Sequence, residues 1–525
     1  MKSKWIIPVF CVLMIFAYHF VAYTGHYGYD DLHYAKLAND LNHGLFDFTD
    51  HYSYRWPVVV LTALSYQLFG INDFASALPA LLVLTTIILL VFQVLKRESV
   101  SVIVAGLSLV CLNPVMLLYS DKLMPDIYLA LAVFAVLYTI SQHRYGKMFR
   151  DPRMAAMVVA GALLVGFMTK TLIVLLFPFL LFLFISDIRK KQFMNFWKWG
   201  IGFTVAFFGI YFFVIFLLTG DPLMRFRTIA DGTLQGPLAE MQTVGFFIRQ
   251  VSYRFFALLT HEGIVPGFLL ALPLLISKKW KDVFAMKDQC AFYMVASVFL
   301  LIAADIFVPG SFMDMYLSVS ARHYLFLVPV MAIPAAYIVG EVFSGVRNPL
   351  PGIAVMFVCA LIAVFLYGNS WATTYFPLLV ILILAALSRN FKSTRRVFLV
   401  LLVLVLMIPP AIMVKRANEI HYAGQRTIVM EEFILPDSDC IVLTDDVQMR
   451  LAKYYQQFSA CRTEFHHFRE VVEMQGKAES VFILQNPYTL HLSGEKDIFQ
   501  NFLKNKDMNR TFSDANTKMV VFQLK

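Results

Sequence analysis

The sequence predicts an all-α polytopic membrane protein with a small C-terminal α/β domain, and three observations lead to this fold class. Hydrophobic residues make up 59% of the 525 residues and charged residues only 15%, whereas soluble domains are roughly 45–50% apolar and about 25% charged. Apolar stretches long enough to cross a bilayer recur along most of the chain. The last part instead alternates short strand-like and helical patterns. This composition excludes disordered, collagen-like and disulfide-stapled secreted proteins.

About 13 windows have the length and apolar content of a transmembrane helix. They are 5–23, 73–95, 99–118, 124–142, 154–169, 171–187, 199–218, 255–277, 290–309, 324–342, 350–367, 373–388 and 397–414.

The net charge of +9 is a topology signal, because Lys and Arg in short loops stay on the cytoplasmic side of a membrane. With Lys2 and Lys4 inside, alternate loops such as 144–153 and 189–198 are rich in Lys and Arg, and the opposite loops are poorer. The N-terminus is therefore predicted to be cytoplasmic and the C-terminal tail extracytoplasmic. Since the cytoplasmic loops account for much of the basic charge, nucleic acid is not predicted as a partner.

These patterns predict two domains, a transmembrane module at 1–414 and an extracytoplasmic α/β domain at 415–525. The outer loop at 24–72 contains the apolar stretch 56–70, which is short for a span and fits a helix at the membrane interface.

In the tail, periodicity predicts both strands and helices. The strand-like runs are 440–444, 479–485 and 520–524, and the helical patterns are 446–457 and 465–474. Cys440 and Cys461 face an oxidising space in this topology, so a disulfide between them and two free thiols are both open.

Acidic residues at the outer ends of the predicted helices are the first candidates for chemistry. Asp30 and Asp31 begin an amphipathic helix just after the first span. The helix dipole alone favours acids there by roughly 0.3–1 kcal/mol each, so simple capping is the alternative explanation. Asp126 follows Pro125 at the mouth of a later helix. An ionised group at the bilayer centre costs about 2.5–3.5 kcal/mol, and such groups are usually functional.

Cations are predicted at the same outer level. Lys170 separates two apolar helices, and Arg322 precedes another. A carboxylate can accept the proton of an acceptor hydroxyl, while Arg and Lys stabilise a departing phosphate. The alternative for both cations is snorkelling to lipid headgroups. Lower-ranked candidates are Arg225, Arg227, Arg249 and Arg254 in the loop 219–254, and His261, Glu262 and Asp305.

In order and membrane side, these motifs resemble those of the GT-C membrane glycosyltransferases, in the bacterial branch near the dolichyl-phosphate-mannose protein mannosyltransferases and the lipid A aminoarabinose transferase. The resemblance covers about residues 5–345 and rests on several short motifs. They are Asp30-Asp31-Leu32-His33-Tyr34-Ala35, the helix at 57–70 ending in Leu-Phe-Gly, the segment Asp73 to Pro79, Asp126, Thr169-Lys170, and Arg322-His323-Tyr324 with Pro329 and Pro334.

The resemblance implies a GT-C-like fold and an integral enzyme of the bacterial cytoplasmic (inner) membrane. It would transfer a sugar, with inversion, from a polyprenyl-phosphate-linked donor to an extracytoplasmic glycan, glycolipid or protein. Asp30 would be the catalytic carboxylate, supported by Asp31 and Asp126. Lys170, Arg322 and Arg254 would hold the donor phosphate, and His33, Tyr34, His323 and Tyr324 would contact substrate.

Some alternatives stay open. Asp31 stands where the family often has Glu, and Trp56-Pro57 where it often has two prolines. No residue is assigned to a metal, although the three acids could supply oxygen ligands to Mg²⁺ or Mn²⁺. The main rival function is a lipid-linked sugar flippase, in which the same charges line a transport path.

Overall fold

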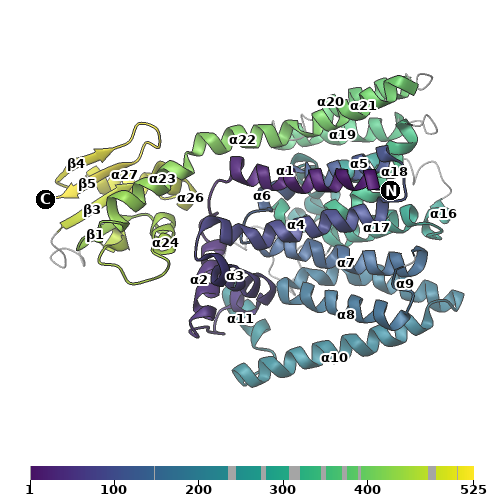
Figure 1. Ribbon diagram of the computed structural model, residues 1–525, viewed down its shortest axis with the longest axis horizontal. Helices are drawn as coiled ribbons and strands as arrows, with labels where there is room; N and C mark the ends of the chain where they lie inside the picture. Colours follow the sequence, from purple (N-terminus) through teal and green to yellow (C-terminus); the bar gives the residue numbers. More distant parts are fainter. Residues whose placement is uncertain are drawn as a thin grey trace.

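The structure is a computed structural model that describes residues 2–146, 148–233, 244–272, 280–306, 320–343, 350–368, 375–387, 392–470, 480–504 and 506–525. Figure 1 shows a bundle of long helices with a small sheet at one end. The N-terminus lies at the other end of the bundle. The predicted fold class is therefore confirmed.

Within the described ranges, seven helical segments are long and apolar enough to cross a membrane. They are α4 (Asp73–Leu95), α7 (Pro125–Tyr145), α8 (Pro152–Thr169), η3 with α9 (Thr171–Lys190), α10 (Met194–Thr219), α17 (Gln289–Ile306) and the segment Val397–Ile434. Further apolar helices are shorter: α1 (Ile6–Ala22), α5 (Val100–Cys111), α18 (Leu327–Phe343), α19 (Leu350–Tyr367) and α20 (Tyr375–Leu387). Each predicted window contains helix, but the count of about 13 spans stays a prediction.

Two predicted windows are interrupted by turns longer than one residue, which corrects their prediction as continuous helices. The window 99–118 divides into α5 and α6 (Pro114–Tyr119), and 255–277 divides into α13 (Phe255–His261) and α14 (Pro266–Ala271). Proline follows each break, because it lacks the N–H that would continue the helix and disfavours helical geometry in the preceding residue.

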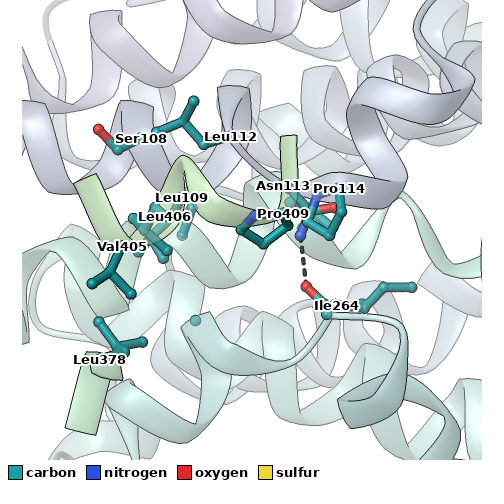
Figure 2. Close-up of a pocket in the computed structure, with 14 residues that line it drawn as sticks. Ser108, Leu109, Leu112, Asn113, Pro114, Ile264, Leu378, Val405, Leu406 and Pro409 are labelled. Carbon is teal, nitrogen blue, oxygen red and sulfur yellow. Dashed lines mark hydrogen bonds between the residues drawn. The ribbon is translucent and has the colours of Figure 1, made fainter. Parts of the chain in front are cut away.

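The turn between α5 and α6 contacts the turn between α13 and α14. Asn113 caps α6 by accepting from the amides of Val115 and Met116, and its Nδ2 donates to the Gly263 carbonyl at 2.7 Å. A small cavity of ≈ 40 Å³ lies beside these turns. Figure 2 shows Asn113, Pro114 and Ile264 at one side of it. Polar side chains thus satisfy backbone groups that the broken helices leave without partners.

Short helices gather at the end of the bundle that carries the sheet (Figure 1). They are α2 (Asp30–Asn42), η2 (His51–Tyr54), α3 (Trp56–Phe69) and α11 (Met224–Thr233). Other short helices include α12 (Val244–Arg249), η4 (Gln250–Arg254), α16 (Trp280–Phe284) and η5 (Ala321–Tyr324). The helices predicted at the acidic pair and at 56–70 are both present.

The C-terminal sheet has the strand order β2-β1-β3-β5-β4. Its strands are β1 (Cys440–Thr444), β2 (Glu464–His467), β3 (Ser480–Gln485), β4 (Met508–Ser513) and β5 (Val520–Leu524). Strand β1 pairs in parallel with β2 and β3, and β5 is antiparallel to β3 and β4. The helices around the sheet are α22 (Ile408–Ile420), α23 (Tyr422–Val429), η7 (Met430–Ile434), α24 (Asp446–Tyr455), η8 (Phe468–Glu470), α26 (Pro487–Ser493) and α27 (Lys496–Lys504).

Side chains of β1 alternate between two apolar cores, because successive residues of a strand point to opposite faces. Cys440 and Val442 pack with Ala452 of α24, whereas Ile441 and Leu443 pack with Phe499 of α27. Helices therefore cover both faces of the sheet.

Most of the tail agrees with the sequence, with one correction. The helix predicted at 465–474 is wrong where the structure has β2, because Phe465 pairs beside Val442 and is buried in the core. Residues 471–474 lie outside the described residues. Cys440 and Cys461 are both free thiols. Helical structure runs across the predicted boundary at 414–415, and the division into two domains stays a prediction.

Candidate active site

Residues predicted at three separate outer helix ends come together around Asp126. Arg322 from η5 lies between two carboxylates, with Nη2 3.2 Å from Asp30 Oδ2 and Nε 3.9 Å from Asp126 Oδ2. These residues are separated by up to 292 positions in the chain. The fold therefore builds one site from the start of α2, the start of α7 and η5.

Lys170 and His323 complete the surroundings of Asp126. Lys170 Nζ lies 2.7 Å from Asp126 Oδ1, and His323 Nδ1 lies 3.1 Å from the same oxygen. Lys170 Nζ is also 2.5 Å from His323 Nδ1. Burial and the neighbouring Lys170 charge lower the pKa of His323 to about 4, outweighing Asp126. The imidazole is therefore neutral at pH 7 and can accept from Lys170.

Lys170 is placed by a break in the chain's helical path. It is the C-cap of α8 with extended backbone, and η3 begins at the next residue. Its side chain is only 10% exposed, so it does not snorkel to lipid headgroups. A buried ammonium needs a counter-charge, and Asp126 supplies it.

The site has unsatisfied polar atoms that point to a ligand. Arg322 Nε and Asp126 Oδ2 are buried without a hydrogen-bond partner, although buried polar groups nearly always have one. A cavity of ≈ 150 Å³ adjoins Arg322 and is also lined by Tyr119, Glu262 and Met413. A phosphate oxygen accepting from the Arg322 Nε–H would satisfy that group.

Tyr52 is a member of the site that the sequence did not reveal. Its hydroxyl donates to Asp30 Oδ1 at 2.9 Å, so Asp30 is held by Tyr52 on one oxygen and by Arg322 on the other. Burial and the Asp30 charge raise the pKa of Tyr52, which stays protonated and remains a donor. Tyr52 lies in an aromatic-rich turn, HYSYRW, a local signal with no indication of its distant partner.

Asp31 points away from this cluster. Its carboxylate is fully buried and accepts from the backbone amides of Tyr27, Gly28 and Leu32, with His26 Nδ1 3.3 Å away. Burial would raise the pKa of Asp31, but His26 and the amide donors outweigh it and lower the pKa. Such contacts hold the loop before α2 in shape.

The other predicted residues have different surroundings. His33 pairs with Asp50, and the Tyr34 hydroxyl accepts from Arg55. Tyr324 is buried against the Phe255 ring, at a centroid distance of 5.1 Å. Arg254 is exposed at the end of η4. Hydrogen bonds and ion pairs join Asp30, Asp126, Lys170, Arg322 and His323.

Among the residues that the structure describes, the two acids of the site are surrounded by cationic side chains and not by further metal ligands. In the described part of the chain, no group of three His, Cys, Asp or Glu side chains is placed to hold a metal ion. The two acids that approach each other face Arg322, and Asp126 also pairs with Lys170. Cationic side chains therefore stand where a bound cation would need carboxylate oxygens.

Comparisons with known proteins show what the fold and part of the sequence are similar to. A family model described as dolichyl-phosphate-mannose-protein mannosyltransferase matches residues 57–216, which include Asp126 and Lys170. The crystal structure of ArnT from Cupriavidus metallidurans in the apo state superposes with a TM-score of 0.58 at 14% sequence identity, covering 99% of this chain and 98% of that one. The chain shares the fold of ArnT.

A second ArnT crystal structure from the same organism, bound to undecaprenyl phosphate, superposes with the same TM-score of 0.58 at 12% identity, covering 100% of this chain and 98% of that chain. No curated protein matches the sequence. The predicted resemblance to GT-C glycosyltransferases near the mannosyltransferases and ArnT is therefore confirmed, and it extends through the C-terminal sheet.

Proposed function

We propose that the protein is an integral-membrane glycosyltransferase that moves a sugar from a polyprenyl-phosphate donor to an extracytoplasmic acceptor. The observation that carries this proposal is the site itself, where Asp30 shares Arg322 with Asp126 beside the buried Lys170. The family match and the ArnT fold support it, as does the undecaprenyl phosphate named for one ArnT structure.

Asp30 is suited to the role of general base. Its carboxylate is about a quarter exposed, so an acceptor hydroxyl can reach it, and such a carboxylate can take the hydroxyl proton as the reaction proceeds. The hydroxyl oxygen then bonds to the anomeric carbon of the donor sugar. The bond from that carbon to the phosphate oxygen breaks, and its electron pair leaves with the polyprenyl phosphate. Attack opposite the leaving group inverts the anomeric carbon.

Arg322 and Lys170 are suited to hold the departing phosphate. Arg322 offers the Nε–H that has no acceptor, and Lys170 carries a compact charge in a buried site where electrostatic stabilisation is strong. Asp126 is buried and already paired with Lys170, which makes it a positioning carboxylate. No metal is required in this scheme.

The experiment is transfer from a radiolabelled polyprenyl-phosphate sugar pool to a delipidated envelope extract by the purified protein. We expect Asp30→Asn to abolish transfer, because the amide cannot accept the proton. Asp47→Asn is the matched control, since Asp47 is an exposed acid of the same outer loop. The labelled fraction would identify the acceptor among glycans, glycolipids and proteins.

Two results would contradict the proposal. Undiminished transfer by Asp30→Asn would remove Asp30 as the base. If label stays on the donor while the donor changes leaflet in proteoliposomes, the protein is a flippase and the charges line a transport path.

A further inference from the structure

A second polar cavity lies between α2 and the C-terminal domain. It has a volume of ≈ 490 Å³ and is formed by one face of α2, the end of α24 and the segment leading into β2. Its lining includes Leu32, His33, Lys36, Arg450, Lys453 and Glu464. We call it the α2–α24 cleft.

The cleft begins within one helical turn of the proposed base. His33, which lines it, follows Asp30 by three residues, and side chains three apart lie on the same side of a helix. The His33 ring packs on Tyr52 with centroids 4.8 Å apart, and the Tyr52 hydroxyl holds Asp30. The cleft therefore adjoins the turn of α2 that carries Asp30.

The charge of the lining favours an anion. Lys36, Arg450 and Lys453 are cationic at neutral pH, whereas Glu464 is the one acid in the lining. Lys36 and Arg450 are about half exposed and pair with the less exposed acids Asp40 and Asp446, at 2.5 and 3.1 Å. Ion pairs at the protein surface contribute about 0–1 kcal/mol, so the negative group of a ligand can compete with these acids for both cations.

The remaining lining suits a sugar better than a lipid chain. Phe458, Ser459 and Ala460 also line the cleft, and Ser459 and Ala460 are exposed. An aromatic ring therefore lies among polar groups, as in sites that orient a polar ligand. The lining also comes only from α2 and the C-terminal domain.

We infer that the α2–α24 cleft is the acceptor site and that it takes an anionic saccharide, with the negative group held by Lys36, Arg450 and Lys453. The assignment as an acceptor site rests on the proposed function. Binding of an anionic saccharide in the cleft can be measured without any sugar transfer. The donor side, around Arg322 and Lys170, and the acceptor side, in the cleft, then meet at Asp30.

Binding to the full-length protein in phosphatidylcholine nanodiscs tests this assignment, with glucose 6-phosphate as the probe and glucose as the uncharged control. We expect the sugar phosphate to bind more tightly than glucose and to weaken as salt is raised, because exposed charges are screened. Lys453→Glu should weaken binding about tenfold, a loss of about 1.4 kcal/mol. Lys504→Glu is the matched control, because it makes the same charge change on α27, which packs on the other face of the sheet.

Equal binding of glucose and glucose 6-phosphate, or equal losses from Lys453→Glu and Lys504→Glu, would overturn the assignment. Adding phosphatidylglycerol to the nanodiscs separates two sources of the ligand. Competition by this lipid would show that an anionic headgroup in the membrane reaches the cleft, as a lipid-anchored saccharide would require. Binding that this lipid leaves unchanged would indicate a saccharide from the aqueous phase. If binding behaves as expected but no sugar is transferred from any polyprenyl donor, the cleft stands and the proposed transferase function fails.

Discussion

Arg322 connects the two carboxylates on which the proposed chemistry depends. Because it contacts both Asp30 and Asp126 and still has an unsatisfied Nε–H, its loss should impair donor handling and leave most of the packing unchanged. We expect Arg322→Ala to lower kcat/KM for the donor by roughly 10²–10³-fold, the range found when one oxyanion donor is removed. Arg322→Lys should recover only part of the lost kcat/KM, since the Lys ammonium lacks the planar guanidinium that can donate two parallel hydrogen bonds.

Steady-state kinetics at limiting donor, together with the thermal unfolding temperature of each variant, checks this prediction. Wild-type kcat/KM in Arg322→Ala would make Arg322 a lipid anchor.

His323 predicts a pH dependence of stability. Its pKa is about 4 in the folded protein, below its ordinary value of 6.5, because burial and Lys170 disfavour the imidazolium. Between these two values the unfolded chain binds the proton and the folded chain does not, so stability falls as pH drops from about 6.5 to about 4. Melting temperatures across this range should fall more steeply for wild type than for His323→Gln. Parallel curves would contradict the assignment.

The site also predicts the response to metal removal. Since Arg322 pairs with both acids and Lys170 with Asp126, we expect transfer to continue after exhaustive treatment with EDTA. An activity that EDTA abolishes and Mg²⁺ or Mn²⁺ restores would show that the acids bind a cation when donor is present.

At this scale the sequence identified the charges but not their contacts. Asp30, Asp126, Lys170 and Arg322 stand out because ionisable groups beside apolar helices are costly. Tyr52 and His26 carry no such signal, since tyrosine and histidine are common at membrane surfaces. Their roles depend on partners that only the folded chain brings near, as with the Tyr52–Asp30 hydrogen bond.

At the level of elements, the loop before α2 is held between the bundle and the C-terminal domain. Gly25 has φ +79°, and a Cβ there would lie 2.0 Å from Tyr422 Cε2. Gly28 has φ +111°, and a Cβ there would lie 2.8 Å from Val447 Cγ1. Both glycines therefore permit a left-handed backbone and a close approach at once.

We predict that Gly25→Ala reduces transfer at least tenfold, because Tyr422 and the loop must separate and Asp30 at the start of α2 then moves. Gly44→Ala is the matched control: Gly44 has φ +71° but open space around it, so it has only the backbone cost of roughly 1–2 kcal/mol. Activity assays and melting temperatures of the two variants check this. Equal effects would show that backbone strain alone matters and that contact with Tyr422 does not position the loop.

The helices and strands also show which features of the fold hydropathy can predict from the sequence and which it cannot. Hydropathy is local, so the window 73–95 coincides with α4. The interruptions at Asn113 and at 262–265 precede prolines that a hydropathy window does not weigh, and the hydrogen bond that joins these two distant turns lies within no single window. The strand β2 was predicted as a helix for the same reason, because its pairing with β1 is a long-range contact.

Across the whole molecule, the C-terminal domain and the bundle form one polar and aromatic interface. Ser76 Oγ contacts the Tyr454 hydroxyl at 2.8 Å, and Arg426 pairs with Asp73 at 3.2 Å. The loop before α2 lies against this interface, through Gly25 on Tyr422 and Gly28 on Val447. The domain is therefore part of the framework that places Asp30.

This framework makes membrane orientation testable in the intact protein. The positive-inside pattern predicts that the loop at 189–198 is cytoplasmic and that the sheet domain is extracytoplasmic. Cys461 lines the α2–α24 cleft and is partly exposed, whereas Lys190 is exposed at the end of α9. We expect a membrane-impermeant maleimide to label Cys461 in intact spheroplasts. In a Cys461→Ser background, Lys190→Cys should react only after the membrane is opened. The reverse pattern would place Asp30, Arg322 and the cleft on the cytoplasmic side, where the acceptor would have to be a cytoplasmic molecule.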